Sequence, residues 1–334
     1  MPPAIPPLAS LQTLERLAQA FATQSVVERK RMLVIVNPYA TTVSDRLRTL
    51  VVSALQGRYD VQAIDTQRQS HATELCREAA QEGYDVVVAF GGDGTVNEAA
   101  NGLAGSDTPL TCLPGGATNV FCKMLGIPGD IVDATEHLLR MADAWVPRKV
   151  DLASVNGRHF TFTAGLGLDA SVVKRVDEHP GRKRRLGAYY FTWSAITDFS
   201  ANYVVKPPQI DVRLPGGDPL DGVTLIVQNS DPFTFFENRP IRLAEGATLE
   251  SGTLAGIVME RSTPTIMPGV IWRAFSSTAR LVDHPAITNF ADATEFTAVV
   301  SDGRPVPLQV DGDYIGDVLE ARFAVAPGAL TVVS

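Results

Sequence analysis

The sequence has few of the residues from which metal centres and disulfide frameworks are built. Its 334 residues include 3 cysteines and 5 histidines. Neither type is clustered, so a zinc site or a disulfide scaffold is not expected. The 29 lysines and arginines are outnumbered by 37 aspartates and glutamates, giving a net charge of −8, which weighs against nucleic acid as a partner. No apolar run approaches the roughly 18 residues of a membrane span, and the first residues do not resemble a signal peptide. We therefore expect a cytoplasmic protein.

The sequence does contain two segments that differ in their pattern of apolar residues, in a chain long enough for two domains. From 31 to 147, apolar runs alternate with helical patterns, which predicts a doubly wound α/β domain with a parallel sheet. From 148 to 324, short alternating runs predict an antiparallel β-sandwich. Helical insertions are expected near 186–204 and 265–280, and residues 1–30 suggest an accessory helix. The runs expected to form single elements include the helix 71–82 and the strand 159–165.

Two glycine turns follow neighbouring predicted strands. The first reads GGDGT at residues 91–95 and the second reads PGGATN at 114–119, while Asn37-Pro38 ends the first strand. The carboxyl ends of parallel strands meet at one edge, where ligands bind in open α/β sheets. Strand, glycine turn and helix together direct backbone N–H groups at phosphate. A single such turn is usually only a tight turn, but three polar loops at one edge favour a nucleotide site.

Asp93 lies inside the first glycine turn, where a carboxylate would repel phosphate. The turn has no Gly-Lys-Ser/Thr, so it is not a Walker loop. Asn97 stands where a dinucleotide fingerprint would have glycine. A cation between the carboxylate and the phosphates would remove the conflict. We therefore expect Asp93 to work with Mg²⁺.

A second pair of carboxylates flanks a glycine at Asp311-Gly312-Asp313. Transfer of a phosphoryl group to an alcohol requires a group that takes the hydroxyl proton. Within a strand the two aspartates would share a face, whereas a turn at Gly312 would direct them apart. From these residues alone, an ordinary Asp-Gly hairpin turn is the favoured interpretation.

A run of basic residues is followed by a run of aromatic residues in the segment 179–199. Arginine and lysine at 182–185 precede tyrosine, phenylalanine and tryptophan at 189–193, and a second apolar segment, TIMPGVIWRAF, covers 265–275. Basic residues beside aromatic ones suit the headgroup region of a membrane. The alternatives are a solvated charge run beside a buried helix, or arginines that reach the phosphates of ATP.

Five segments in order resemble the diacylglycerol kinase catalytic family, which includes bacterial soluble lipid kinases and the sphingosine kinases. They are VIVNPYA, GGDGTVNEAANGL, LPGGATNVFCKMLGIP, RKVDLASVNGRHFTFTAGLGLDASV and VPLQVDGDYIG. The likeness runs from about Met32 to the end of the chain and is of an actinobacterial type. It implies an NAD-kinase-like α/β domain at 31–147, a β-sandwich at 148–324, and a return of residues 325–334 to the first domain. It also implies a lipid kinase that uses ATP and Mg²⁺ to phosphorylate a lipid hydroxyl, with diacylglycerol converted to phosphatidic acid as the leading reaction.

The resemblance further implies roles for individual residues. Asp313 would be the general base and Asp311 would orient it or share the metal network. Asp93 and Asp151 would organise a catalytic Mg²⁺. The residues implied at the nucleotide are Asn37, Pro38, Thr66, Gly91, Gly92, Asp93, Gly94, Thr95, Asn97, Gly116, Ala117, Thr118 and Asn119.

The chain departs from the family at several of these positions. Asp313 replaces the usual glutamate of Asp-Gly-Glu. A structural Mg²⁺ implied at Thr248, Ser251 and Thr253 is weakened because Ser251 stands where relatives have aspartate. The loop after Asn37-Pro38 supplies neither glycine nor lysine. An NAD-kinase-like phosphotransferase and a non-catalytic nucleotide or lipid binder therefore stay open as alternatives. The expected partner is a lipid substrate at the membrane surface, with peripheral attachment and with a homodimer left open.

Overall fold

The computed structural model describes residues 13, 16, 29–142, 145–177, 207–236 and 239–334. These residues divide into two units, each described here by itself. The N-terminal unit contains the chain up to Val150 together with Gly328–Ser334, and the C-terminal unit contains Asp151–Pro327. Several predictions fall outside the described residues. They are most of the accessory helix, the helical insertion near 186–204, and the basic cluster at 182–185 that precedes it.

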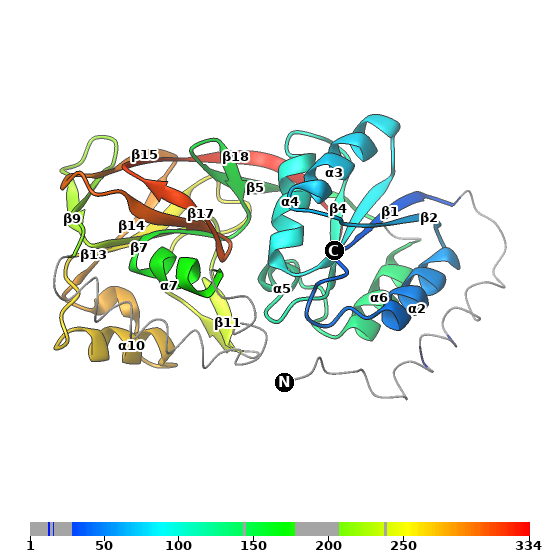
Figure 1. The fold of residues 1–334 in the computed structure, drawn as a ribbon, viewed down its shortest axis with the longest axis horizontal. Coiled ribbons are helices and arrows are strands. Elements are labelled where there is room, and N and C mark those ends of the chain that lie inside the picture. The colour runs from blue at the N-terminus through cyan, green and yellow to red at the C-terminus, as the bar shows by residue number, and fades with distance from the viewer. Residues whose placement is uncertain (1–12, 14–15, 17–28, 143–144, 178–206, 237–238) are drawn as a thin grey trace. The chain divides into compact units, whose positions relative to one another are not determined.

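The N-terminal unit is a parallel sheet with helices on both faces (Figure 1). Its elements are β1 (Arg31–Val36), α2 (Asp45–Gln56), β2 (Asp60–Asp65), α3 (His71–Glu82), β3 (Val86–Gly91), α4 (Asp93–Leu103), β4 (Leu110–Pro114), α5 (Val120–Met124), α6 (Ile131–Met141) and the end of β18 (Glu320–Val332). The strands follow the order β2, β1, β3, β4, β18, and each neighbouring pair is parallel. Helix α3 packs with α4, and α2 packs with α6 on the opposite face. The prediction of a doubly wound α/β domain is confirmed.

Local sequence signals explain where these helices begin and end. The Ser44 side chain accepts a hydrogen bond from the Leu47 N–H and caps α2. Asp130 caps α6 in the same way, through the N–H groups of Val132 and Asp133. Helix α3 ends at Gly83, whose φ of 70° is the left-handed value that favours glycine after a helix. Its bounds, 71–82, are those predicted from the apolar spacing.

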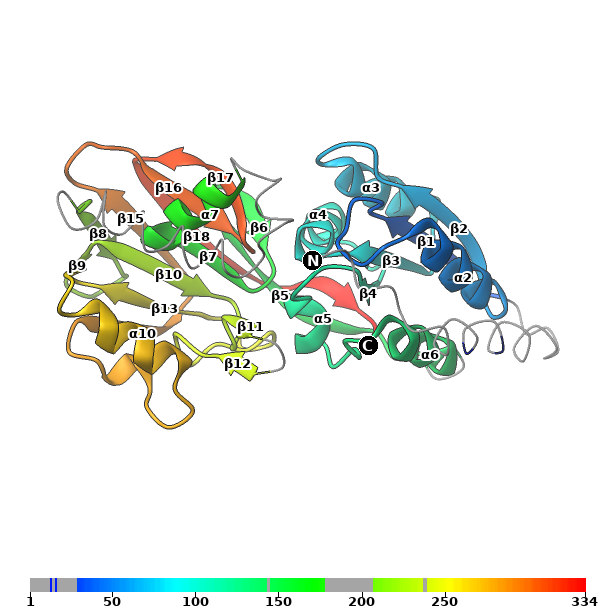
Figure 2. The ribbon, with the colours of Figure 1, turned by 60° about the horizontal axis from the view of Figure 1, so that its bottom comes forward.

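The C-terminal unit is a sandwich of two antiparallel sheets, as predicted (Figure 2). Its elements are β5 (Arg148–Val155), β6 (Arg158–Phe160), β7 (Thr163–Gly167), α7 (Leu168–Asp177), β8 (Ile210–Arg213), β9 (Leu220–Gly222), β10 (Thr224–Gln228), β11 (Thr234–Phe236), β12 (Arg239–Ile241), β13 (Leu254–Met259), α10 (Met267–Phe275), β14 (Ile287–Ala293), β15 (Glu295–Val300), β16 (Val306–Val310) and β17 (Asp313–Val318). One sheet has the order β14, β13, β10, β7, β16, β17. The other contains β18, β15, β8 and β9, with β5 and β6 beside β18. Leu166 and Val258 of the first sheet share a buried core with Phe296 and Phe323 of the second.

The expected single strand at 159–165 is wrong, because the chain breaks there into β6 and β7. The backbone N–H groups of Thr161, Phe162 and Thr163 all point to the carboxylate of Asp311. Donors that bond a side chain are not available to a strand ladder. The break is therefore imposed by a residue about 150 positions away, which no local pattern contains.

Strand β18 belongs to both units. It pairs with β15 and β5 in the C-terminal unit. Its last residues enter the sheet of the N-terminal unit, where Val332 lies beside Leu110 and the Val333 N–H donates to the Leu110 carbonyl at 3.0 Å. None of the helices in the described part of the chain is long and apolar enough to cross a bilayer.

Candidate active site

The two glycine turns of the N-terminal unit lie in direct backbone contact. β3 and β4 are neighbours, with Gly91 opposite Pro114, and the Gly115 N–H donates to the Gly91 carbonyl at 2.9 Å. A Cβ atom built on Gly116 would lie 2.7 Å from the Gly92 Cα. No side chain fits there, so glycine is required by close approach of the two turns. The two turns therefore pack against each other at the carboxyl edge of the sheet.

Asn37 ties the first loop to this surface. Its backbone N–H donates to Phe90 O, and its side-chain Nδ2 donates to Thr95 Oγ1 at 3.1 Å. Its Oδ1 accepts the N–H of Tyr39 at 3.0 Å, which closes the turn after β1. Thr66 follows β2 at the same edge, held by its N–H to Val36 O. All three polar loops expected at this edge, and the end of β2, are thus brought together.

Asp93 is the first residue of α4 and lies between the two turns. Gly92 precedes it in extended conformation as the N-cap. The Asp93 Oδ1 accepts the N–H of Phe121, at the start of α5, at 3.2 Å. A carboxylate near the start of a helix is stabilised by the helix dipole. The repulsion expected between this carboxylate and phosphate is therefore reduced partly by a backbone donor, and carboxylate oxygens are ligands of the kind that Mg²⁺ takes.

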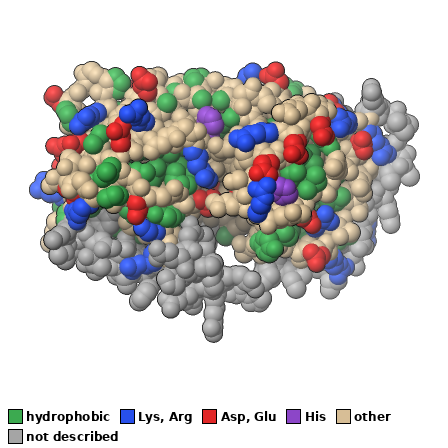
Figure 3. All heavy atoms as spheres, turned by 45° about the horizontal axis from the view of Figure 1, so that its top comes forward, with side chains coloured by type: hydrophobic (Ala, Val, Ile, Leu, Met, Phe, Trp, Pro, Cys, Tyr) green, Lys and Arg blue, Asp and Glu red, His purple; other side chains and the backbone are tan. Residues whose placement is uncertain are grey.

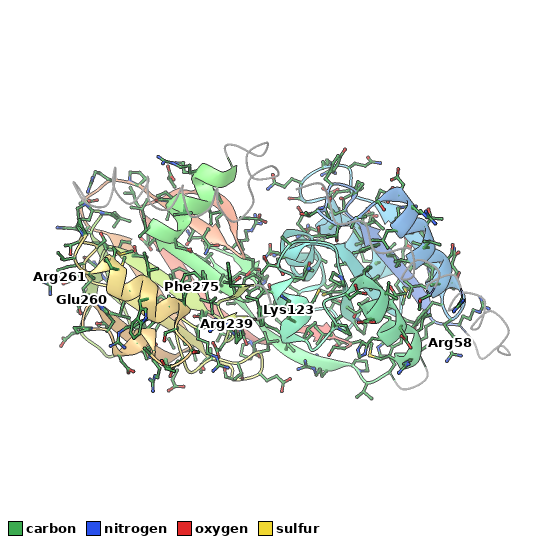
Figure 4. The ribbon with its side chains drawn as sticks, turned by 90° about the horizontal axis from the view of Figure 1, so that it is seen from below. Arg58, Lys123, Arg239, Glu260, Arg261 and Phe275 are labelled. Carbon is green, nitrogen blue, oxygen red and sulfur yellow. The ribbon has the colours of Figure 1, made fainter. Side chains whose placement is uncertain are left out.

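Lys123 is a cation close to Asp93 that the sequence reasoning missed. It lies on α5 (Figure 4). Burial lowers the pKa of Lys123, and the nearby Asp93 carboxylate acts in the opposite direction. The signal that could have found Lys123 is the i, i+4 spacing from Asn119, which places both residues on one side of a short helix.

The other residues implied at the nucleotide have more varied surroundings. Asn119 is buried, and its side chain bonds the N–H and the carbonyl of Gly116. Asn97 is buried within α4, where its carbonyl accepts the side chain of Asn101. Asn119 therefore shapes the second turn from within. Pro38 and Ala117 are exposed, whereas Gly94, Thr118 and Thr66 are half-buried.

Asp311 and Gly312 form the two-residue turn between β16 and β17, in the C-terminal unit. Val310 pairs with Asp313 across it, and the φ angles of Asp311 and Gly312 are 48° and 83°. Positive φ at both central residues is the signature of a type I′ hairpin turn, for which Asp-Gly is favoured. Asp313 begins β17 and is half-buried. The turn therefore directs the two aspartates apart, with Asp311 inside and Asp313 toward the surface.

The carboxylate of Asp311 is buried and held by four donors. Its Oδ2 accepts the N–H and the hydroxyl of Thr161 at 2.7 and 2.8 Å, and its Oδ1 accepts the N–H groups of Phe162 and Thr163 at 3.0 and 3.1 Å. Burial raises the pKa of Asp311, and the four donors act against that rise. These contacts give Asp311 a structural role that explains its position without any part in chemistry.

Asp311→Ala is expected to destabilise the C-terminal unit by at least about 3 kcal/mol, because each buried donor left unsatisfied costs about 1–3 kcal/mol. Asp313→Ala, two residues further on, is the matched control and should cost less than about 1 kcal/mol. The measurement is the free energy of unfolding from denaturant titration. Equal losses in the two variants would contradict the structural role of Asp311.

The side chains of Gln309 and Asp169 support the same hairpin turn through a series of hydrogen bonds. The Gln309 Oε1 accepts the N–H of Gly312 at 2.9 Å, and its Nε2 donates to the Asp169 Oδ2 at 2.7 Å. Asp169 lies in the first turn of α7, directly after β7. Gly165 leaves it room, because a Cβ there would lie 2.2 Å from the Asp169 Oδ2. Asp169 and Gln309 thus position the turn that carries Asp313, and neither was identified from the sequence.

Asp169→Asn is expected to stabilise the protein at about pH 8 and to lose that advantage toward about pH 4. Burial raises the pKa of Asp169 to about 6, above the value of about 3.9 in unfolded chains. The fold therefore prefers the protonated carboxyl, and its contribution to stability is complete below the unfolded pKa and lost as pH rises through about 6. The gain at high pH should be about 1–3 kcal/mol, since one pKa unit is about 1.4 kcal/mol. Denaturant titrations of both proteins across this range provide the check, and a difference independent of pH would contradict it.

Asp151 is buried in β5, and its contacts lie within the C-terminal unit. Its Oδ2 accepts the Gly252 N–H at 2.6 Å, and its carbonyl accepts the Asn229 side chain at 2.9 Å. Asp151 thereby anchors the loop that contains Thr248, Ser251 and Thr253. A role for its carboxylate at a metal stays a prediction.

The residues of that loop do not fit the structural Mg²⁺ implied by the resemblance. The Ser251 hydroxyl makes hydrogen bonds to the carbonyls of Thr248 and Thr253 at 3.1 and 3.2 Å. The carbonyl oxygens of Thr248 and Thr253, which a cation at this site would use as ligands, thus accept hydrogen bonds from the Ser251 hydroxyl. Among the residues placed by the structure there is no group of three or more His, Cys, Asp or Glu side chains able to hold a metal. Asp93 does fit Mg²⁺, which often binds one or two carboxylates together with substrate phosphates.

Comparison with known proteins gives a consistent picture. A family model described as the diacylglycerol kinase catalytic domain matches residues 31–155. The chain is 36% identical over 145 residues to a diacylglycerol kinase of Bacillus subtilis (strain 168), covering 41% of this chain and 46% of that protein. It is 28% identical over 308 residues to a diacylglycerol kinase of Staphylococcus aureus (strain bovine RF122 / ET3-1), covering 88% of this chain and 89% of that protein.

Solved structures agree with the fold. A crystal structure of a diacylglycerol kinase from Bacillus anthracis str. Sterne aligns with a TM-score of 0.67 and 20% identity, covering 92% of this chain and 98% of that chain. Another structure from the same organism aligns with a TM-score of 0.73 and 23% identity, covering 93% and 97%. At these identities the likeness shows the two-part fold alone.

Proposed function

We propose that the chain, whose residues 31–155 match the model of the diacylglycerol kinase catalytic domain, is a lipid kinase of that family and transfers the γ-phosphoryl group of ATP to the free hydroxyl of diacylglycerol, forming phosphatidic acid. The family match and the two relatives at 36% and 28% identity support a lipid kinase. The choice of diacylglycerol is supported by the names of its relatives, including the one similar over 88% of this chain. The proposal also includes Mg²⁺ as the metal and attachment to the membrane surface.

The observation that carries the proposal is the contact between the two glycine turns beside Asp93. Gly92 and Gly116, which are half-buried, form a surface of closely packed backbone next to the N-terminus of α4. Backbone N–H groups at a helix start form an anion site. Lys123, close to Asp93, adds a positive charge at the same place. Such a surface suits the phosphates of ATP and has no evident purpose in a protein that binds only an apolar molecule.

The residues of the N-terminal unit bind and orient the nucleotide in this mechanism. The turn at 91–95 contacts the phosphates through its backbone, and Asn37 fixes that turn through Thr95. Asp93 would hold Mg²⁺, which when bound neutralises charge on the phosphates. Lys123 adds a positive charge near the same carboxylate.

The residues of the C-terminal unit prepare the acceptor. The hydroxyl oxygen of the lipid forms a bond to the γ-phosphorus, and the bond from that phosphorus to the bridging oxygen of ADP breaks. The hydroxyl proton goes to the carboxylate of Asp313. Asp311, Gln309 and Asp169 hold the hairpin turn so that Asp313 keeps its place. This division of roles explains why the first aspartate of the pair is buried and the second is half-buried.

The test is a phosphorylation screen with the full chain, labelled ATP and Mg²⁺. The acceptors are dispersed diacylglycerol, monoacylglycerol, sphingosine and ceramide, with NAD as an acceptor that is not a lipid. Labelled phosphatidic acid as the main product, dependent on Mg²⁺, is expected. Preferential labelling of a sphingoid base or ceramide would overturn the choice of diacylglycerol, and labelling of NAD alone would overturn the lipid kinase itself.

A further inference from the structure

Helix α10 exposes apolar side chains on its outer side although its inner side already packs on the protein. Met267, Val270 and Ala274 pack against a buried cluster of the C-terminal unit. Ile271, Trp272 and Phe275 are 52%, 61% and 54% exposed. At 100° per residue these three share an adjacent arc of the helix. A surface helix that is apolar on both its inner and outer sides indicates an interaction site.

The hairpin of β11 and β12 extends this surface. Phe236 is 52% exposed, and its ring meets that of Phe275 edge to face, with centroids 6.1 Å apart. In Figures 1 and 2 the hairpin lies at one end of α10. We call Phe236, Ile271, Trp272 and Phe275 the aromatic face. They account for four of the seven large apolar side chains that are exposed among the described residues.

Two arginines supply positive charge beside the aromatic face, within a protein of net charge −8. Arg273 lies on α10, with its guanidinium 6.0 Å from the centroid of the Trp272 ring, and Arg239 lies on β12. Arg280 pairs with Glu245 and Asp283. In Figure 4 Arg239 lies on the side of Phe275, whereas Arg261 lies beside Glu260 and away from Phe275. Acidic and basic side chains are interspersed on the face shown in Figure 3.

We propose that the aromatic face inserts into the headgroup region of an anionic membrane, with Arg239 and Arg273 against the lipid phosphates. Tryptophan and phenylalanine favour this depth, and arginine adds attraction to anionic lipid. A second copy of the chain is the less suitable occupant, because a two-fold interface would set these arginines against each other. The reason for a membrane partner rests on the proposed lipid kinase function, but the contact itself can be measured without catalysis.

The test is binding of the full chain to vesicles of phosphatidylcholine with phosphatidylglycerol, followed by sedimentation. Trp272→Ser with Phe275→Ser is expected to weaken binding at least tenfold, on the order expected from the apolar area lost. Leu319→Ser is the matched control, since Leu319 is 48% exposed but lies outside the aromatic face. Arg239→Gln and Arg273→Gln should each weaken binding about fivefold on these vesicles and have little effect on pure phosphatidylcholine.

Two further measurements separate the outcomes. Tryptophan fluorescence of the wild type should shift to the blue on anionic vesicles, and Trp272→Phe should abolish most of that shift. Vesicle binding unchanged in the double variant, or lowered equally by Leu319→Ser, would overturn the proposal. So would a wild-type dimer that the double variant converts to monomers while vesicle binding persists. Wild-type insertion through this face without phosphorylation of any lipid would instead overturn the proposed function and leave the docking surface standing.

Discussion

Turnover of the Asp313→Asn variant is expected to fall by about 100- to 10,000-fold, the usual cost of removing a general base. The apparent affinity for ATP should change little, because Asp313 belongs to the C-terminal unit, whereas the turns proposed to bind phosphate belong to the N-terminal unit. The fold should also be retained, since Asp313 is half-buried and the hairpin turn is held by Asp311 and Gln309. The measurement is the turnover number at saturating lipid.

Asp313→Glu provides the matched control. It keeps the carboxylate and lengthens the side chain by one methylene, so much of the activity should survive. If Asp313→Asn stays near the wild-type rate while Asp93→Asn is inactive, then the base is another residue. Asp93 would be the next candidate, because it lies at the surface that receives the phosphates.

Asp93→Asn is expected to lower Mg²⁺-dependent turnover by about a thousandfold or more. The reason is that stabilising the charge on the transferring phosphoryl group lowers the barrier by several kcal/mol. An asparagine Oδ1 can still accept the Phe121 N–H that Asp93 accepts now. Melting temperature should therefore stay close to that of the wild type. The variant separates loss of a charge from loss of a hydrogen bond.

Two further readings test whether Asp93 acts through a metal. Titration with Mn²⁺ or Mg²⁺ in the presence of ATP should show weaker metal dependence in Asp93→Asn than in the wild type. Asp85→Asn is the control, because Asp85 precedes β3 at the opposite edge of the same sheet and its carboxylate binds the Arg31 N–H. Full activity of Asp93→Asn at ordinary Mg²⁺ would refute the assignment.

Much of the fold follows from local pattern because the decisive interactions are local. The apolar spacing at 71–82 is that of a helix, and Gly83 ends it with positive φ. Continuous apolar runs such as that of β3 are buried on both faces, as expected of a parallel sheet. The two glycine turns could be recognised because close backbone approach leaves glycine as the only residue that fits. Whether they bind ATP stays a prediction.

What the sequence could not reveal depends on contacts between distant residues. Asp311 makes the break between β6 and β7. The position of Asp313 depends on Gln309 and on Asp169, which lies 140 residues before Gln309. Asp311 illustrates the limit well. Its pattern with Asp313 suggested a pair of catalytic carboxylates, and its four donors became visible only in three dimensions. A titratable residue in a motif can be required by packing as much as by chemistry.

The course of strand β18 has a consequence for how the protein is made. The N-terminal unit is synthesised first, but its sheet needs Gly328–Ser334, whose Leu330, Val332 and Val333 are buried in it. On the ribosome the sheet of this unit is therefore expected to stay incomplete, with an open edge beside β4, until the whole C-terminal unit has emerged. Exposed edges of this kind invite pairing with other chains. The nascent nucleotide-binding unit is thus the stage of biogenesis at which chaperone protection should matter most.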